Sequence, residues 1–205
     1  MKNYLMLNNK QIELSPEQVK QIEESFGFNK TQLKDVAVGE TFKVGDLEFI
    51  VLEQKEYNPG NCETFVILKD FWKTDKFDDL SNDYKESSIR KSLNTEFYAL
   101  LSNAVGSENI VKHTVELTAD DGRTDYGNCE DNISLLTCEM YRKFVYILDK
   151  YNPKKWWWLA TAYSTKSNDY SLFVRCVLYI GTLRCGSCGN GRGVRPFCIF
   201  DPSIF

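Results

Sequence analysis

The amino-acid sequence predicts an α+β domain, and three observations lead to that class. The stretch 110–117 alternates apolar and polar residues, and 41–52 has two strand-like runs, which is typical of strands. Two other stretches, 87–101 and 137–148, place apolar residues at helical spacing. The chain has 205 residues, of which 42% are hydrophobic, and this is enough for one sizeable core.

The first thirty residues predict a small separate module. Two short apolar runs around a polar turn form a hairpin over 4–14. Ser15 then caps a helix, and Gln18 completes the capping box. We therefore expect a hairpin-helix module over 1–30 and a larger domain over 36–205.

Strands and one helix open the larger domain. The hairpin over 41–52 turns at Gly45-Asp46, a strand follows over 64–68, and a charged and aromatic loop covers 70–86. Ser87 opens the first main helix. Its apolar face is expected to carry Ile89, Leu93, Phe97, Leu100 and Leu101.

A second helix and further strands complete the domain. After the strand at 110–117, residues 118–128 are rich in turn formers, and 133–136 form a short strand. Thr137 caps the second main helix. The residues expected to face inward from it are Met140, Phe144, Ile147 and Leu148. From Trp156 onward the pattern indicates strands and loops, with one of the three rings of Trp156-Trp157-Trp158 partly exposed.

The charge is uneven along the chain. The net charge is −4, with +6 in residues 150–205 and −10 in residues 1–149. An acidic balance argues against a general DNA-binding protein, although opposed surface fields can steer a partner. No apolar run reaches 18 residues and no signal peptide is visible, so we expect neither a transmembrane helix nor export. The expected location is the cytoplasm of a bacterial host.

Few residues are available for catalysis. His113 is the single histidine, so any Ser-His-Asp or Cys-His site must use it, and multi-histidine metal sites are excluded. Its position in an alternating run favours a hydrogen-bonded strand residue. No cofactor motif is present, because the glycines at 186–193 are not followed by the Gly-Lys-Ser/Thr of a phosphate loop. We expect a protein that is not an enzyme and has no cofactor.

Two groups of residues raise the question of a metal. Cys185-Gly186-Ser187-Cys188 is a C-x-x-C pair, and Cys176 and Cys198 could add two zinc ligands. Their spacing differs from that of a zinc ribbon, so unliganded thiols are favoured and zinc stays open. The oxygen-rich run 120–131 could hold calcium, but its glycine comes too early for an EF-hand, and turns explain it as well. We therefore assign no metal site.

Four runs, in order, resemble an uncharacterised domain common in Firmicutes and their phages. They are Ser88–Phe97, Asp131–Glu139, Trp157–Thr161 and Gly193–Phe197, against the family patterns S-x-I-R-x-x-L-N-x-x-F, D-x-I-x-L-L-S-x-x-E, W-W-L-R-S-P and G-V-R-P. The resemblance spans about residues 36–200, and Ala160-Thr161-Ala162 departs from R-S-P. The hairpin-helix over 1–27 resembles small leaders seen on many phage accessory proteins, which implies a phage accessory protein.

The C-terminal part is also similar to the C-type-lectin-like fold of formylglycine-generating enzymes and retroelement variable proteins. The resemblance implies a mixed fold of antiparallel strands and two main helices. It also implies a ligand-binding face drawn from 163–170 and 179–192. The predicted partner-binding residues are Tyr163, Lys166, Asn168, Tyr170, Tyr179, Arg184, Ser187, Asn190 and Arg192. The paired catalytic cysteines of formylglycine-generating enzymes have no counterpart at matching spacing.

Two functions from different classes follow. The first is a phage or mobile-element protein that inhibits a host effector by protein-protein contact. A CRISPR-associated nuclease ribonucleoprotein is the candidate, since its basic channel would attract acidic residues 1–149. The alternative is a lectin-like ligand-binding module that uses the variable-type loop face. The sequence leaves open the oligomeric state and whether nucleic acid is contacted directly.

Overall fold

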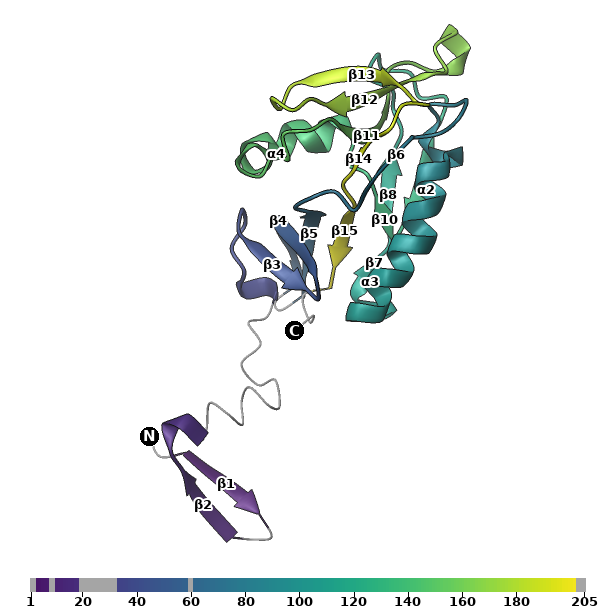
Figure 1. Ribbon diagram of the computed structural model, residues 1–205. Coiled ribbons are helices and arrows are strands. Elements are labelled where there is room, and N and C mark those ends of the chain that lie inside the picture. Colours follow the sequence, from purple (N-terminus) through teal and green to yellow (C-terminus); the bar gives the residue numbers. More distant parts are fainter. Residues whose placement is uncertain (1–2, 8–9, 19–32, 59–60, 202–205) are drawn as a thin grey trace. The chain divides into compact units, whose positions relative to one another are not determined.

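The computed structural model describes residues 3–7, 10–18, 33–58 and 61–201 (Figure 1). The chain divides into two compact units, of which the smaller reaches to Gln32 and the larger begins at Leu33. In the smaller unit, β1 (Asn3–Leu7) pairs antiparallel with β2 (Lys10–Leu14).

The predicted capping box follows this hairpin. The Ser15 hydroxyl accepts a hydrogen bond from the Gln18 backbone N–H at 3.2 Å, and the Gln18 side-chain oxygen accepts from the Ser15 N–H at 2.9 Å. These two bonds satisfy two backbone donors that a helix start leaves free. The continuation of this helix lies outside the described residues.

One of the two large sheets has six antiparallel strands in the order β10-β15-β5-β4-β3, with β7 also paired to β15. The hairpin β3–β4 turns at Gly45, whose φ of +56° suits glycine. The strands are β3 (Thr41–Val44), β4 (Leu47–Asn58), β5 (Asn61–Leu68), β7 (Ile110–Val111), β10 (Ile133–Ser134) and β15 (Phe197–Phe200).

The other large sheet has five strands in the order β13-β12-β11-β14-β6. Only the pair β11–β14 is parallel in it. The strands are β6 (Lys73–Asp75), β11 (Trp157–Ala162), β12 (Phe173–Val177), β13 (Leu183–Ser187) and β14 (Arg192–Val194). A separate ribbon joins β8 (His113–Glu116) to β9 (Asn128–Asp131). Short helical turns are η1 (Leu33–Asp35), η2 (Tyr84–Glu86), η4 (Ser107–Asn109) and η5 (Lys166–Asn168).

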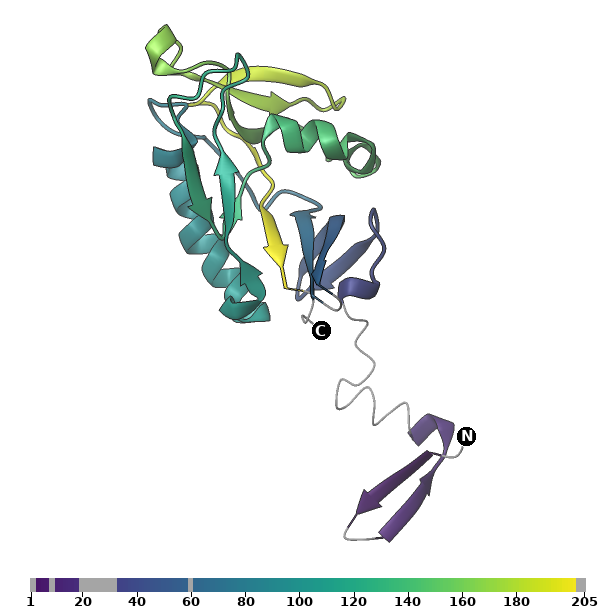
Figure 2. The ribbon, with the colours of Figure 1, turned by 180° about the vertical axis from the view of Figure 1, so that it is seen from behind.

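Helix α4 (Cys138–Lys150) lies between the two large sheets (Figures 1 and 2). Thr137 caps it as predicted, because its hydroxyl accepts from the Met140 N–H at 3.2 Å. Phe144 and Leu148 are buried, and Met140 and Ile147 pack against the same core, which confirms the predicted face. This core combines side chains of both sheets, so the helix joins them into one unit.

The first main helix is interrupted by a wider turn. It consists of α2 (Ser88–Ser92), the π-helical turn η3 (Leu93–Phe97) and α3 (Tyr98–Val105). The buried residues follow at a constant spacing of four: Ile89, Leu93, Phe97 and Leu101. The inward placement of Leu100 was wrong, since its side chain is 47% exposed. A wider turn advances the buried stripe by one residue, so that it passes through position 101.

The four runs with family resemblance contact one another in pairs. The Arg90 guanidinium binds the buried Asp131 carboxylate at 2.7 Å, and the Asn94 amide donates to the Ile133 carbonyl at 2.8 Å. Trp157 pairs with Gly193 across the parallel strands, and the buried Arg195 guanidinium lies 4.8 Å from the Trp157 ring centroid. These motifs therefore hold the fold together.

The architecture confirms a mixed α+β fold of mostly antiparallel strands with few helices. Within the described residues, no helix combines the length and apolar character needed to cross a membrane.

Candidate functional site

A group of exposed apolar side chains lies where β12 begins. We call Tyr163, Tyr170, Leu172 and Phe173 the hairpin patch, because they flank the start of the β12–β13 hairpin. They are 38%, 46%, 44% and 39% exposed, and the rings of Tyr163 and Tyr170 have centroids 5.7 Å apart. Exposed apolar groups that gather in one place mark interaction sites more often than scattered ones do.

A buried amide fixes the loop that carries the hairpin patch. Asn82 is fully buried, and its Nδ2 lies 2.8–2.9 Å from the carbonyl oxygens of Ser164, Tyr170 and Phe173. Its Oδ1 accepts a hydrogen bond from the Tyr126 hydroxyl at 2.7 Å. The Asn82 side chain therefore satisfies backbone carbonyls of a loop some 80 residues later in the chain.

Two carboxylates hold the other side of this loop. Asp125 accepts from the hydroxyls of Ser167 and Thr165, and these bonds hold its pKa below the usual value. Asp121 accepts from the Ser164 hydroxyl at 2.6 Å, which likewise lowers its pKa. Two carboxylates of the oxygen-rich run 120–131, Asp121 and Asp125, thus serve to order the loop. The hairpin patch is presented on a pre-organised surface, which reduces the entropy that binding would cost.

The nine predicted partner-binding residues fall into separate places. Tyr163, Lys166, Asn168 and Tyr170 lie on the loop of the hairpin patch, and Ser187 pairs with Phe173. Tyr179 and Arg192 line a pocket with Trp156. Arg184 is exposed on β13, and Asn190 is exposed in the turn before β14. Phe173 and Val177 stand at the two ends of β12, four residues or about 13 Å apart along the strand. The hairpin patch and the turn after Val177 therefore lie at opposite ends of β12.

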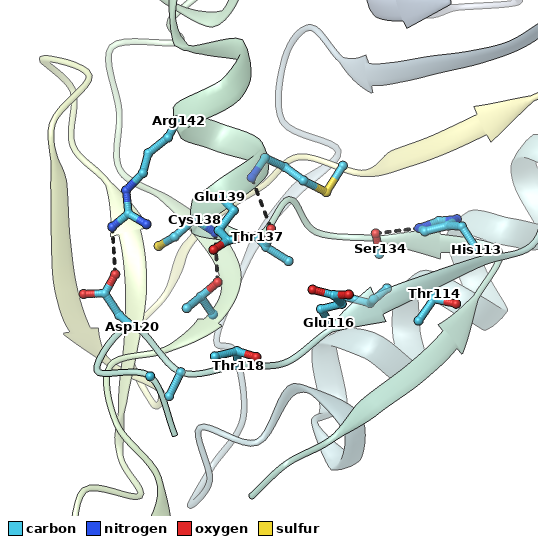
Figure 3. A pocket seen from close by; sticks show the side chains of 15 residues that line it. His113, Thr114, Glu116, Thr118, Asp120, Ser134, Thr137, Cys138, Glu139 and Arg142 are labelled. Atoms are coloured by element: carbon cyan, nitrogen blue, oxygen red, sulfur yellow. Dashed lines mark hydrogen bonds and ion pairs between the residues drawn. The ribbon is translucent and has the colours of Figure 1, made fainter. Parts of the chain in front are cut away.

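A second hollow opens at the start of α4 (Figure 3). It has a volume of about 430 Å³ and lies between β8, β10 and the first turn of the helix. A neighbouring cavity of about 400 Å³ shares His113, Thr114 and Met140 with it. The polar side chains that line the hollow include His113, Glu116, Asp120, Ser134, Cys138 and Arg142.

Two of these groups, Cys138 and Asp120, have pKa values shifted by their surroundings. Burial raises the pKa of the Cys138 thiol to about 11, so it stays protonated at neutral pH. Burial alone would raise the pKa of Asp120, but hydrogen bonds from Arg175 and Arg142 outweigh it and hold the carboxyl ionised. At neutral pH the Cys138 thiol is therefore not a thiolate nucleophile, and the Asp120 carboxylate has no proton to donate.

His113 bonds to a buried serine. Its Nε2 lies 2.9 Å from the Ser134 hydroxyl, and its ring packs edge-on against Phe197. Within the described residues, no carboxylate bonds to its Nδ1, so none orients the ring as in a catalytic triad. Burial lowers its pKa.

This burial predicts a pH dependence of stability. The unfolded chain binds a proton on His113 near pH 6.5, whereas the folded protein binds it only at lower pH. The stabilisation that comes from keeping His113 neutral and buried is therefore complete above about pH 6.5. The free energy of unfolding falls as the pH decreases towards the pKa of His113 in the folded protein. Urea denaturation between pH 7.5 and 5 is expected to show a steeper loss for the wild type than for His113→Gln. Equal slopes would contradict the burial of this ring.

The candidate zinc ligands are dispersed. Cys176 pairs with Arg184 and Cys185 with Arg175, so these two thiols lie on opposite faces of the sheet. Cys198 belongs to the other large sheet. Across residues 3–7, 10–18, 33–58 and 61–201, no three His, Cys, Asp or Glu side chains gather as a metal site would require.

The triple-tryptophan run has the predicted exposure. Trp157 and Trp158 are 1% and 0% exposed, and Trp156 is half-buried. Trp157 contacts Tyr141, and Trp158 contacts Phe77. The run therefore joins the core on both faces of the sheet and leaves one ring at the surface.

The fold and the site define a mixed α+β domain with a pre-organised aromatic surface. Residues 63–202 match the family described as a domain of unknown function (DUF6273), and the chain belongs to that family. This confirms the predicted membership in an uncharacterised family. No curated protein and no solved structure matches the chain.

Sequence reasoning missed Asn82 and two residues of the hairpin patch. Asn82 stands in a polar loop, where an asparagine is common and signals only a turn. Leu172 and Phe173 have the composition of a buried strand, but their side chains are 44% and 39% exposed. Only the long-range contacts identify these positions.

Proposed function

We propose that this protein is a non-enzymatic binding protein whose hairpin patch docks onto a partner protein. The observation that carries the proposal is the exposure of four large apolar side chains on a loop fixed by buried polar bonds. Tyrosines give contact area at a low entropic cost, and a fixed loop avoids the cost of ordering. The protonated thiol of Cys138 supports binding over nucleophilic catalysis.

The finer proposal concerns the partner. Resemblance to phage accessory proteins supports a host effector in the bacterial cytoplasm, with a CRISPR-associated nuclease as the first candidate. The acidic residues 1–149 complement the basic channel of such a nuclease. A C-type-lectin-like arrangement fits this proposal, since such folds bind through the loops at the end of a sheet.

The test is affinity capture from a lysate that contains CRISPR effectors, read by mass spectrometry. The wild type is expected to recover a nuclease in near-stoichiometric amount. Tyr170→Gln/Leu172→Gln is expected to reduce that recovery at least about tenfold, because large apolar side chains dominate protein interfaces. A matched control is Tyr146→Gln/Leu100→Gln, which removes a tyrosine and a leucine that are 86% and 47% exposed on helices α4 and α3.

Two outcomes would contradict the proposal. Equal recovery with the patch variant and the control variant would place the contact elsewhere. Recovery of no cytosolic protein, together with binding on a glycan array that the patch variant loses, would favour the lectin-like module. In either case, an unchanged melting temperature of both variants shows that folding is not the cause.

A further inference from the structure

A second surface site lies beyond the proposed protein contact. It is a shallow pocket of about 430 Å³ between the 154–156 segment, the turn after β12 and the start of β14. We call it the basic pocket and define it by Phe71, Lys154, Lys155, Trp156, Tyr179 and Arg192. Its volume falls within the range of about 300–1,000 Å³ that is usual for small-ligand sites.

The charged residues that line the basic pocket are all positive. Three cationic side chains line it, from Lys154, Lys155 and Arg192, and no carboxylate does. Within the described part of the chain, none of these three forms an ion pair. The Nε of Arg192 is buried and also has no hydrogen-bond partner among the described residues. The protein therefore leaves this positive charge unneutralised, which favours an anionic ligand.

The position of Arg192 is fixed by stacking. Its guanidinium carbon lies 4.2 Å from the ring centroid of Trp156 and 5.2 Å from that of Trp158. Gly186 gives it room, since a Cβ there would lie 2.7 Å from the guanidinium. A rigid cation on aromatic rings keeps its charge and loses little entropy when it binds.

Aromatic rings supply the other half of the recognition chemistry. Trp156 is half-buried, Tyr179 is 52% exposed, and Phe71 closes the wall of the pocket. Gly193 admits the Phe71 ring, because a Cβ at that position would lie 2.4 Å from it. Flat rings beside cations suit a ligand that joins a planar ring to a phosphate.

We infer that the basic pocket binds a nucleotide, with its phosphates at Lys154 and Lys155 and its base stacked on the exposed ring of Tyr179. The nucleotide can be free or part of a single strand, since both offer the same base and phosphate. This inference is independent of the hairpin patch. The patch variant Tyr170→Gln/Leu172→Gln is therefore expected to leave the nucleotide affinity unchanged.

The test is a calorimetric titration of the full chain with ADP, adenosine, pyrophosphate and a five-residue thymidine oligonucleotide. ADP or the oligonucleotide is expected to bind at least tenfold more tightly than adenosine or pyrophosphate, because only they offer both halves of the ligand. Affinity is expected to fall as salt rises from 50 to 200 mM. Tighter binding of ADP would identify a free nucleotide as the source, and tighter binding of the oligonucleotide a single strand.

Charge variants make the assignment specific to this pocket. Lys154→Asn/Lys155→Gln is expected to weaken ADP binding about tenfold, and asparagine suits the positive φ of +59° at Lys154. The matched control Lys85→Gln/Lys91→Gln removes two exposed lysines elsewhere and is expected to retain the affinity. Tyr179→Ala is expected to weaken the binding of ADP more than the binding of pyrophosphate.

Three results would overturn the inference. Pyrophosphate that binds as tightly as ADP would reduce the site to a simple anion site. Equal losses in the pocket and control variants would show unspecific attraction by net charge. Absence of binding by all four probes to a folded protein would exclude the nucleotide.

Discussion

Trp158→Ala is expected to lower the free energy of unfolding by about 3–5 kcal/mol. The side chain is 0% exposed, its indole N–H donates to the Asp75 carbonyl at 3.0 Å, and its ring packs against Phe77. The substitution leaves a large cavity at the middle strand of the five-stranded sheet and removes the indole hydrogen bond to β6. Urea denaturation followed by circular dichroism measures the change.

The neighbouring ring provides the control for this prediction. Trp156 is half-buried, so Trp156→Ala is expected to cost much less than Trp158→Ala. Trp158→Phe should recover part of the loss, because it refills most of the cavity without the indole hydrogen bond. An unchanged urea midpoint for Trp158→Ala would contradict the burial of the ring.

Asn82→Asp is expected to cost about 3 kcal/mol or more, although the side chain keeps its shape. A carboxylate has no N–H to offer the carbonyl oxygens of Ser164, Tyr170 and Phe173, and each buried group left unpaired costs about 1–3 kcal/mol. The negative charge would also lie among the carbonyl dipoles. Hydrogen exchange should show increased opening of residues 163–173, and the urea midpoint should fall.

The control for Asn82→Asp is Asn190→Asp. Asn190 is exposed, so the same chemical change should leave the urea midpoint nearly unaltered. The loss in free energy of unfolding caused by Asn82→Asp should become smaller in acid, because a protonated carboxyl regains one hydrogen to donate. A loss that is equal for both variants, or no loss for Asn82→Asp, would show that the amide does not hold the loop.

Local signals predicted most of the secondary structure. The capping residues Ser15 and Thr137 and the turn at Gly45 act within a few residues, so the sequence alone reveals them. Leu100 was misplaced because a regular helical period cannot foresee a π-helical turn. Phe97, at the end of that turn, packs against Trp72, a contact that the local helical pattern does not reveal.

The site was less predictable than the fold. The family-like motifs attract attention in the sequence, but Arg90 with Asp131 and Trp157 with Gly193 serve to hold the fold. The surface features depend on contacts between residues far apart in the chain, as Asn82 with Phe173 shows. Spacing and composition carry little information about such contacts, and the residues of the predicted face are dispersed in the structure.

The order of the strands has a consequence for synthesis of the chain. Strand β15 lies between β10 and β5, and β14 lies between β11 and β6, so the last two strands in the sequence occupy interior positions in both large sheets. Neither sheet can close while the ribosome still holds residues 192–200. The larger unit is therefore expected to complete its folding only after residues 192–200 have left the ribosome, and to depend until then on chaperones that shield its unpaired strand edges.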